Sequence, residues 1–218
     1  LEFRRVLFRS WTAAAGSTIY DGGAWPAKWA ATERYSFFMG EATRQLFHHE
    51  FLDPKGPTFQ GRKEDGRKQT EFLASTDPWF RPTTLKVGPD GALYVADMYR
   101  FVLEHPEWIS AEMQARVNLR AGDDRGRIYR IRPRSAPRRS IPDLTRLDTQ
   151  GLVAAMDSPN GWQRDRVQRL LLQRRDAAVI PGLRSRLAPK HPPQVRVQAL
   201  ATLDRKSTRL NSSHEWIS

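Results

Sequence analysis

The sequence predicts a mainly β fold in its first part and an α-helical fold in its last part. Two patterns of apolar residues support this prediction. Short apolar runs separated by Gly, Pro, Asp and Asn fill residues 11–134, which is typical of antiparallel strands. From residue 143 to 203 the apolar residues recur every three or four positions, as they do in amphipathic helices. A linker rich in Pro, Arg and Ser, residues 135–142, separates the two parts.

The clearest strand signal is a hairpin over Leu85–Asp97. Pro89-Asp90-Gly91 supplies its tight turn, because Pro fixes φ and Gly accepts a positive φ. Further along, Arg127–Ile131 alternates as a strand with one solvated face does. The strands that we predict are Tyr35–Met39, Gln45–Glu50, Thr70–Leu73, Thr84–Val87, Leu93–Ala96 and Arg127–Ile131.

Several short antiparallel strands indicate a sandwich, a barrel or a propeller. The Gly-Pro-Asp-Gly hairpin, followed by an excursion and a Gly-Arg-Ile-Tyr-Arg-Ile strand, resembles one blade of a β-propeller. We therefore expect residues 11–134 to form the closing blades of a partial β-propeller. Glu104–Val117 has apolar residues at helical spacing and is predicted to be a helical insertion.

Three segments of the last part place their apolar residues on one helical face: Gln163–Arg174, Ala177–Leu187 and Gln194–Leu203. The segment 194–200 resembles the core of a HEAT repeat, with Arg196 at the usual arginine of that repeat. We expect residues 143–203 to be a truncated HEAT-type α-solenoid, because fewer than three repeats do not bury a complete core.

The two ends of the chain are related at the DNA level. A DNA string that encodes Leu1–Ser10 has a reverse complement that, entered one base in, encodes Asp204–Ser213. The string also resembles a sequencing-library adapter. We therefore expect residues 1–10 and 204–218 to be adapter-derived artefacts. On this interpretation Trp11–Leu203 is an internal fragment of a larger protein.

The composition restricts the classes of partner and cofactor. The chain has a net charge of +12, and its basic residues are mostly Arg, dispersed from Arg34 to Arg196 without a basic block. An Arg-rich genome gives the same dispersal, so we do not expect a nucleic-acid partner. No apolar run of roughly 18 residues is present, so we predict no membrane-spanning segment. The absence of Cys excludes disulfides, thiolate metal sites and covalent haem attachment within this chain.

Several phrases of the sequence together resemble one family. The chain is similar to the last blades of membrane-bound dehydrogenases whose propeller is related to glucose and sorbosone dehydrogenases. In that family HEAT repeats and a haem-binding cytochrome c domain follow the propeller. The phrases that carry the resemblance are Thr18-Ile19-Tyr20, Ala74–Pro82, Gly88–Arg100, Glu104-His105-Pro106 and Gly122–Arg130.

The resemblance implies an oxidoreductase of the periplasm or cell envelope that oxidises a sugar or related alcohol and passes electrons to a haem. It implies pyrroloquinoline quinone and Ca²⁺ as cofactors, with haem only in a C-terminal domain that this chain lacks. Because the catalytic blades of the relatives come earlier in the chain, we expect this fragment to be inactive. The alternative is a non-catalytic scaffold that binds a protein or glycan, for example a protein partner through its HEAT repeats.

Four residues are candidates for a cofactor site at the channel mouth. Arg81 suits an anionic cofactor, although a salt bridge with Asp77 or Asp97 is the favoured role. Asp97 ends a predicted strand, where it is able to bind a cofactor or to close a turn by a side-chain hydrogen bond. Tyr99 and Arg100 follow it and are expected to line the same rim.

Histidines and paired acids are the remaining candidates. His105 is the candidate catalytic residue, because His titrates near neutrality and Glu104 lies beside it. His48 and His49 alternate across a strand and are not expected to bind one metal together. Asp123-Asp124 has the carboxylates that Ca²⁺ prefers, but the following Arg125 indicates a self-neutralised turn, so we predict no metal site.

Overall fold

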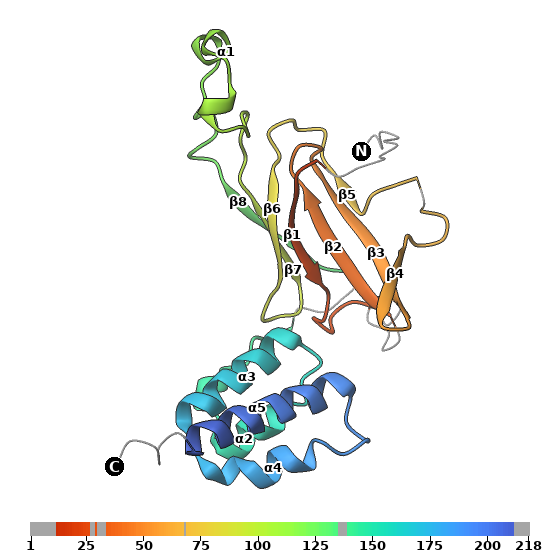
Figure 1. Cartoon of the computed structure of the whole chain (residues 1–218), viewed down its shortest axis with the longest axis vertical. Coiled ribbons are helices and arrows are strands. Elements are labelled where there is room, and N and C mark those ends of the chain that lie inside the picture. Colours follow the sequence, from red (N-terminus) through yellow and green to blue (C-terminus); the bar gives the residue numbers. More distant parts are fainter. Residues whose placement is uncertain (1–11, 27–28, 30–33, 68, 135–138, 212–218) are drawn as a thin grey trace. The chain divides into compact units, whose positions relative to one another are not determined.

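The computed structural model describes residues 12–26, 29, 34–67, 69–134 and 139–211 (Figure 1). The chain divides into two compact units. The sheet unit comprises residues 1–20, 25–88 and 92–136, and the helical unit comprises residues 21–24, 89–91 and 137–218. Of the expected adapter segments, residues 1–10 and 212–218 lie outside the described residues, and residues 204–211 continue the last helix.

The first sheet of the sheet unit has five antiparallel strands. Strand β3 is central: it pairs with β2 along one edge and with β4 and β5 along the other, and β1 pairs with the far edge of β2. The register places Phe38 opposite His49. The strands are β1 (Ala14–Ile19), β2 (Tyr35–Glu41), β3 (Leu46–Lys55), β4 (Thr58–Arg62) and β5 (Leu73–Ala74).

The second sheet has the strand order β6-β7-β8, with β6 (Pro82–Val87), β7 (Leu93–Asp97) and β8 (Arg127–Ile131) all antiparallel. The predicted hairpin is thereby confirmed. Its turn contains Gly91 at φ 79°, a conformation that favours glycine over residues with a Cβ.

The two sheets pack against each other where β1 and β2 cross β6. The crossing is close: a Cβ on Gly16 would lie 2.5 Å from the Thr83 carbonyl oxygen. Glycine is required there because any side chain would separate the two backbones. The fully buried side chains near this contact are Phe38, Phe47, Leu85, Leu93 and Val95. Such burial stabilises a fold by roughly 1.5–3 kcal/mol per large side chain.

The predicted helix over Glu104–Val117 is confirmed only in part. A short 3₁₀ helix covers Pro106–Trp108, and α1 covers Ala111–Arg116 with Ser110 as its N-cap. Neither buries a residue. Figure 1 shows this excursion extending away from the sheets between β7 and β8.

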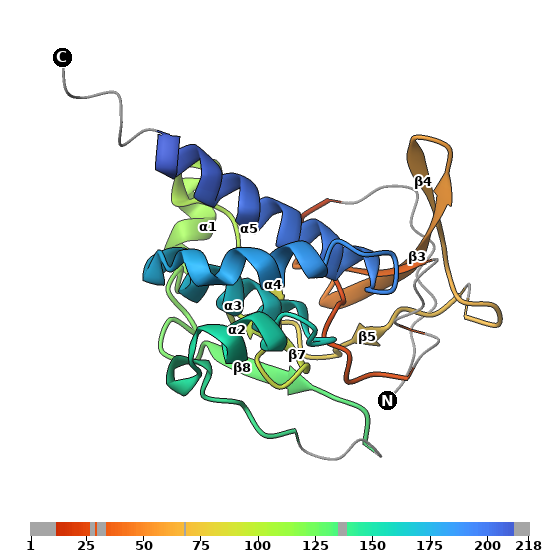
Figure 2. The same ribbon diagram turned by 90° about the horizontal axis from the view of Figure 1, so that it is seen from below.

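The helical unit contains α2 (Thr149–Ala155), α3 (Gly161–Arg174), α4 (Ile180–Ser185) and α5 (Pro193–Asn211). Side chains of Asp148 and Asn160 cap α2 and α3. Helix α5 packs on both α3 and α4 (Figure 2). One aliphatic cluster joins the helices: Leu144, Leu152, Val153, Met156, Val167, Leu170, Leu171, Val179, Leu183, Val195 and Ala199.

Residues 21–24 belong to the helical unit because polar contacts attach them to α3. The Gly161 amide donates to the Asp21 carbonyl, and the buried Arg164 guanidinium donates to the Asp21 carboxylate at 3.3 Å and to the Ser158 carbonyl at 2.9 Å. Burial raises the pKa of Asp21 and lowers the pKa of Arg164, so this ion pair forms where solvation of both charges is reduced.

The expected partial β-propeller and HEAT-type solenoid are wrong. The described strands form two open sheets, neither of which closes into a ring or barrel, and the described helices of the helical unit share one core instead of stacking as repeated pairs. Antiparallel hairpins and amphipathic helices are local patterns that many architectures share. Closure of sheets and stacking of repeats depend on long-range contacts that a local pattern does not specify.

Three elements were missed and one was displaced. β1 is rich in Ala and Gly, β4 is largely polar, and α2 has little more than two turns, so each has a weak periodic signal. The strand predicted at Thr70–Leu73 is instead the two-residue β5, which pairs with Leu46 and Phe47. The other predicted strands and the three predicted helical segments coincide with described elements, with shifted ends.

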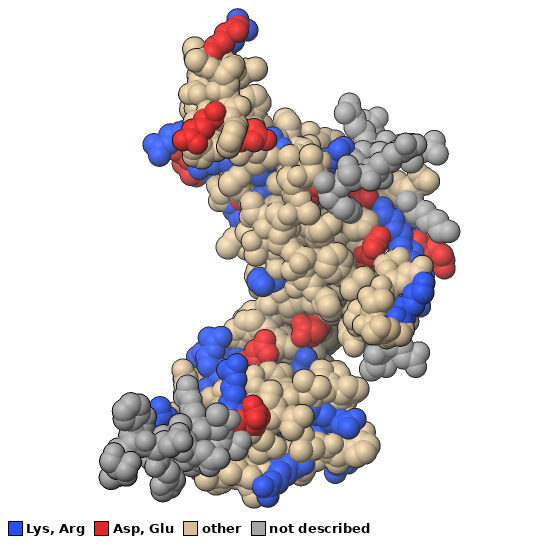
Figure 3. Space-filling model, viewed as in Figure 1, with Lys and Arg blue, Asp and Glu red and all other residues tan. Residues whose placement is uncertain are grey.

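Charge is distributed over the surface without one continuous basic tract on the face seen in Figure 3, where basic and acidic side chains are interleaved. Many arginines have acidic neighbours at ion-pair distance, including Arg116 with Glu112 and Arg62 with Asp53. Among the described residues, no helix combines the length and the apolar composition needed to cross a membrane.

Candidate functional site

Arg81 lies immediately before β6 with its side chain buried against main-chain carbonyls. Its guanidinium donates to the carbonyls of Arg100 at 2.9 Å, Ala42 at 3.0 Å and Phe101 at 3.2 Å. Burial lowers the pKa of Arg81 from its ordinary value. The guanidinium thus joins three separate segments of the sheet unit.

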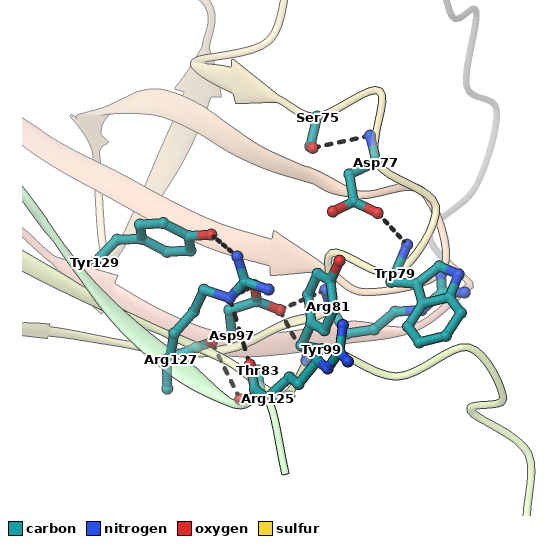
Figure 4. Close-up of polar contacts among 11 residues, drawn as sticks. Ser75, Asp77, Trp79, Arg81, Thr83, Asp97, Tyr99, Arg125, Arg127 and Tyr129 are labelled. Atoms are coloured by element: carbon teal, nitrogen blue, oxygen red, sulfur yellow. Dashed lines mark hydrogen bonds and ion pairs between the residues drawn. The ribbon is translucent and has the colours of Figure 1, made fainter. Parts of the chain in front are cut away.

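Asp97, the last residue of β7, closes the turn that follows the strand (Figure 4). Its Oδ1 accepts hydrogen bonds from the backbone amides of Arg81 at 2.8 Å and Tyr99 at 2.9 Å. Tyr99 has φ 52°, which the Asp97 hydrogen bond helps to hold. Asp97 is therefore placed to fix the backbone at the end of the hairpin.

Arg127 on β8 completes this cluster. Its Nε lies 3.8 Å from Asp97 Oδ2, its guanidinium lies 3.8 Å from the centre of the Tyr99 ring, and its Nη1 is 3.4 Å from the Tyr129 hydroxyl. Figure 4 shows Asp97 between Arg81, Tyr99 and Arg127: the backbone amides of Arg81 and Tyr99 and the side chain of Arg127 approach its carboxylate. We call Arg81, Asp97, Tyr99 and Arg127 the hairpin cluster.

The hairpin cluster does not fit pyrroloquinoline quinone. The quinone's carboxylates need cationic donors that face a cavity. Arg81 is instead committed to three carbonyls, and Arg100 donates to the carbonyl of Arg120 on the surface. The structure places Arg81, Asp97 and Tyr99 close together, but their polar groups bind one another and main-chain carbonyls instead of a cofactor. We derive no chemical step through the quinone.

His105, the candidate catalytic residue, is far more exposed than the hairpin cluster. Its ring accepts a hydrogen bond from the Glu107 amide at 3.3 Å and caps the 3₁₀ helix. Its nearest carboxylate is that of Glu107, at 3.8 Å, and not that of the adjacent Glu104. Its side chain is 65% exposed.

A small, partly open pocket with a cavity volume of about 20 Å³ lies where β3 meets the segment after β4. Aromatic, basic and acidic side chains line it together: Trp29, His49, Lys63, Glu64, Arg67, Thr70, Glu71 and Phe72. We call it the His49 pocket. It lies outside every site that the sequence predicted.

His49 contributes a buried polar side chain to the wall of this pocket. The residue is only 7% exposed, and its ring packs among the rings of Trp29 at 4.5 Å, Phe38 at 4.6 Å and Phe51 at 4.8 Å between centres. Its Nε2 has no hydrogen-bond partner among the described residues. A buried polar atom without a partner costs free energy, so a ligand or water that binds it is favoured.

The environment keeps His49 uncharged. Burial, together with the neighbouring His48, lowers the pKa of His49 to about 4. The imidazole is therefore neutral at physiological pH, with one ring nitrogen able to donate a hydrogen bond and the other able to accept one.

His48 is held by carboxylates on the opposite face of β3. Its Nδ1 lies 2.7 Å from Glu71 and its Nε2 lies 3.1 Å from Glu50, while Lys63 binds the other oxygen of Glu71 at 2.6 Å. Burial acts to raise the pKa of Glu71, but the hydrogen bonds from His48 and Lys63 outweigh burial and lower it. The predicted alternation of the two histidines is confirmed.

The described residues contain no group of three or more His, Asp or Glu placed to hold a metal ion. His48 and His49 diverge, and Asp123 and Asp124 pair with Arg120 at 3.9 Å and Arg125 at 3.7 Å. The implied Ca²⁺ therefore finds no fitting donor set in this part of the chain.

Sequence reasoning missed the His49 pocket because its walls come from separate segments. The signal that was available is the His48-His49 pair inside an aromatic strand, with a cluster of charges after β4. Only the strand pairing shows that His49 faces the aromatic side and that residues 63–72 return to it.

Comparison with known proteins gives one match. No curated protein and no solved structure matches the chain. A family model described as a domain of unknown function, DUF7133, matches residues 3–135, which is more than half of the chain and contains the described strands of both sheets. The chain therefore belongs to the DUF7133 family.

Proposed function

We propose that the sheet unit binds a small hydroxylated ligand, a sugar or related alcohol, in the His49 pocket, and that this binding serves an oxidoreductase that passes electrons to a haem. The observation that carries the proposal is the buried, neutral His49 whose Nε2 has no partner among the described residues. A hydroxyl group both donates and accepts, so it suits either nitrogen of a neutral imidazole.

The rest of the pocket supports a ligand with one apolar and one polar side. Trp29 and Phe72 offer aromatic surface, with ring centres 6.0 Å apart, and Thr70 and the charged residues offer polar contacts. The cavity volume is about 20 Å³, which is room for about one water molecule. The pocket therefore admits one hydroxyl group of a ligand, and the ring that carries this hydroxyl has to lie outside the cavity.

The proposal that the bound ligand is oxidised rests on the family resemblance. Removal of a hydroxyl proton requires a base, and the neutral His49 is able to accept one. Because its pKa is about 4, His49 is a weak base at neutral pH. The contribution that the chain's own residues support best is binding and orientation of the hydroxyl. The quinone, the haem and a periplasmic or envelope location remain parts of the proposal that come from the resemblance alone.

A second function is favoured by the excursion between β7 and β8. Trp108, on the 3₁₀ helix, is 79% exposed, and Met113, on α1, is 51% exposed. Large apolar side chains that remain in solvent are characteristic of surfaces that bind other proteins. On this second reading the unit is a non-catalytic scaffold for a protein or glycan partner.

The ligand proposal is tested by titrating the complete chain with a panel of monosaccharides and polyols, using calorimetry and NMR line broadening. At least one is expected to bind, and His49→Phe is expected to weaken that binding at least tenfold, about 1.4 kcal/mol. His105→Phe, an exposed histidine outside the pocket, is the matched control and should leave binding unchanged. Equal binding by wild type and His49→Phe would remove the proposed site.

The oxidoreductase part needs the longer protein. It should be supplied with pyrroloquinoline quinone, Ca²⁺ and an artificial electron acceptor, and each sugar that binds should be tested for oxidation. Binding without oxidation of any sugar or alcohol would favour the scaffold function, while oxidation lost in Trp108→Ala but kept in His49→Phe would contradict the role of the pocket.

A further inference from the structure

The solvent face of the second sheet is basic and ends at an open edge. The strand register places Lys86 beside Tyr94 and Tyr94 beside Arg130, so these three side chains share one face. The opposite face carries Leu85, Leu93 and Val95 and is buried, so the first face is the one in solvent. The residues of this basic face are Thr84, Lys86, Tyr94, Ala96, Ile128 and Arg130, none of which is acidic.

Strand β8 forms the edge of that sheet. Among the described residues it pairs only with β7, and its first four residues are exposed. Ile128, in the middle of the basic face, is 74% exposed. An edge strand presents unpaired backbone amides and carbonyls, which form a template for another strand. Arg132 and Arg134 follow β8 in the sequence, whereas Arg125, before it, lies 3.7 Å from Asp124.

We propose that an acidic, extended segment of a partner protein binds here by adding a strand to β8. Backbone hydrogen bonds along β8 give affinity, and alternate side chains of the added strand lie beside Arg130, with which their carboxylates pair. A partner apolar side chain covers Ile128. This site is separate from the His49 pocket and does not depend on the ligand proposed for it.

A second copy of this chain is a poorer occupant. Each β8 carries Arg127 and Arg130 and no acidic residue, so pairing two β8 strands brings like charges together, which destabilises a sheet. A single-stranded nucleic acid is also a poorer occupant. Binding of bases requires exposed aromatic faces, and the Tyr94 ring lies so close over Gly88 that a Cβ there would be 2.2 Å from it.

The test uses the complete chain and a fluorescein-labelled peptide of alternating glutamate and valine, followed by fluorescence anisotropy. The peptide should bind, and the double variant Arg130→Glu, Arg132→Glu should weaken binding at least tenfold. The control variant Arg169→Glu, Arg184→Glu changes the same charge on exposed positions of α3 and α4 and should leave the affinity within about twofold.

Two further measurements separate strand addition from simple charge attraction. A peptide with proline at its centre keeps the charge but lacks a backbone donor, so it should bind at least tenfold more weakly. Hydrogen exchange of the amides in Arg127–Ile131 should slow when the unbroken peptide is bound. Equal binding of the proline peptide, unchanged exchange, or tighter binding of an oligonucleotide of equal charge would each overturn the proposal.

Discussion

The hairpin cluster and the His49 pocket are both polar regions of the sheet unit, and they differ in what surrounds their polar atoms. Arg81 donates to three carbonyls and Asp97 Oδ1 accepts from two amides. Asp97 Oδ2 has no hydrogen-bond partner among the described residues, but Arg127 of the same cluster places its Nε 3.8 Å from it. His49 Nε2 also lacks a hydrogen-bond partner there, and the His49 ring lies among aromatic rings at the wall of a pocket. The comparison teaches that residue type alone does not separate a structural network from a binding site.

The largest expected effect is on Arg81. Arg81→Ala leaves three carbonyls, of Ala42, Arg100 and Phe101, without their donor, and should lower the free energy of unfolding by about 3 kcal/mol or more. Urea denaturation checks this value. Arg125→Ala is the control, because the Arg125 side chain is exposed and its change should stay within about 0.5 kcal/mol. If Arg81→Ala lowered the free energy of unfolding by less than about 1 kcal/mol, the Arg81 side chain would not be what holds the segments of Ala42 and of Arg100 and Phe101 together.

The second effect is a dependence of stability on pH. In the unfolded chain His49 has its ordinary pKa of 6.5, and in the folded chain its pKa is about 4. Between these values the unfolded state binds more protons, so the free energy of unfolding falls as the pH falls from 6.5 towards 4. The full window is worth roughly 3 kcal/mol, and urea denaturation at a series of pH values measures it.

His49→Phe isolates this contribution, since phenylalanine keeps the aromatic packing and does not titrate. The other charged groups that line the pocket are Lys63, Glu64, Arg67 and Glu71, and His48 acts on His49 from the opposite face of β3. The lowered pKa of Glu71 means that its own contribution disappears only below its ordinary value of 4.5. Measurements of the free energy of unfolding above pH 5 therefore separate the contribution of His49 from that of Glu71. If the pH dependence in that range were the same in His49→Phe, the neutral state of His49 would not contribute to stability.

A smaller effect is expected at Asp97. Asp97→Ala removes the acceptor of the Arg81 and Tyr99 amides and should cost about 2 kcal/mol, whereas Asp97→Asn keeps an oxygen acceptor and should cost about 1 kcal/mol. Thermal unfolding of both variants provides the measurement. An equal loss in the two variants would show that the negative charge beside Arg127, and not the turn, is what matters.

The smallest effect is expected at His105. Its side chain is exposed and makes one weak capping contact, so His105→Ala should change the free energy of unfolding by less than about 0.5 kcal/mol. It should also leave ligand binding in the His49 pocket unchanged. A tenfold loss of binding in this variant would move the candidate site from the pocket to the excursion.

Local elements were predictable because their signals are local. The hairpin followed from Pro89-Asp90-Gly91, and Gly91 has the positive φ that such a turn uses. The three helical segments were predictable from the spacing of their apolar residues. Val167 and Leu171 of α3 and Leu183 of α4 are all buried in the shared core. The grouping of Arg81, Asp97 and Tyr99 was also predictable from their places around one hairpin.

The sequence by itself determined the Leu85–Asp97 hairpin, three of the helical segments and that His48 and His49 face opposite ways, because backbone periodicity assigns alternate residues to opposite faces of a strand. Only the tertiary structure decided that the sheets stay open, that the helices share one core, and that residues 63–72 return to His49. These outcomes depend on contacts between distant segments. Whether a polar atom is satisfied or left to bind a ligand is such an outcome, since its partners come from elsewhere in the chain.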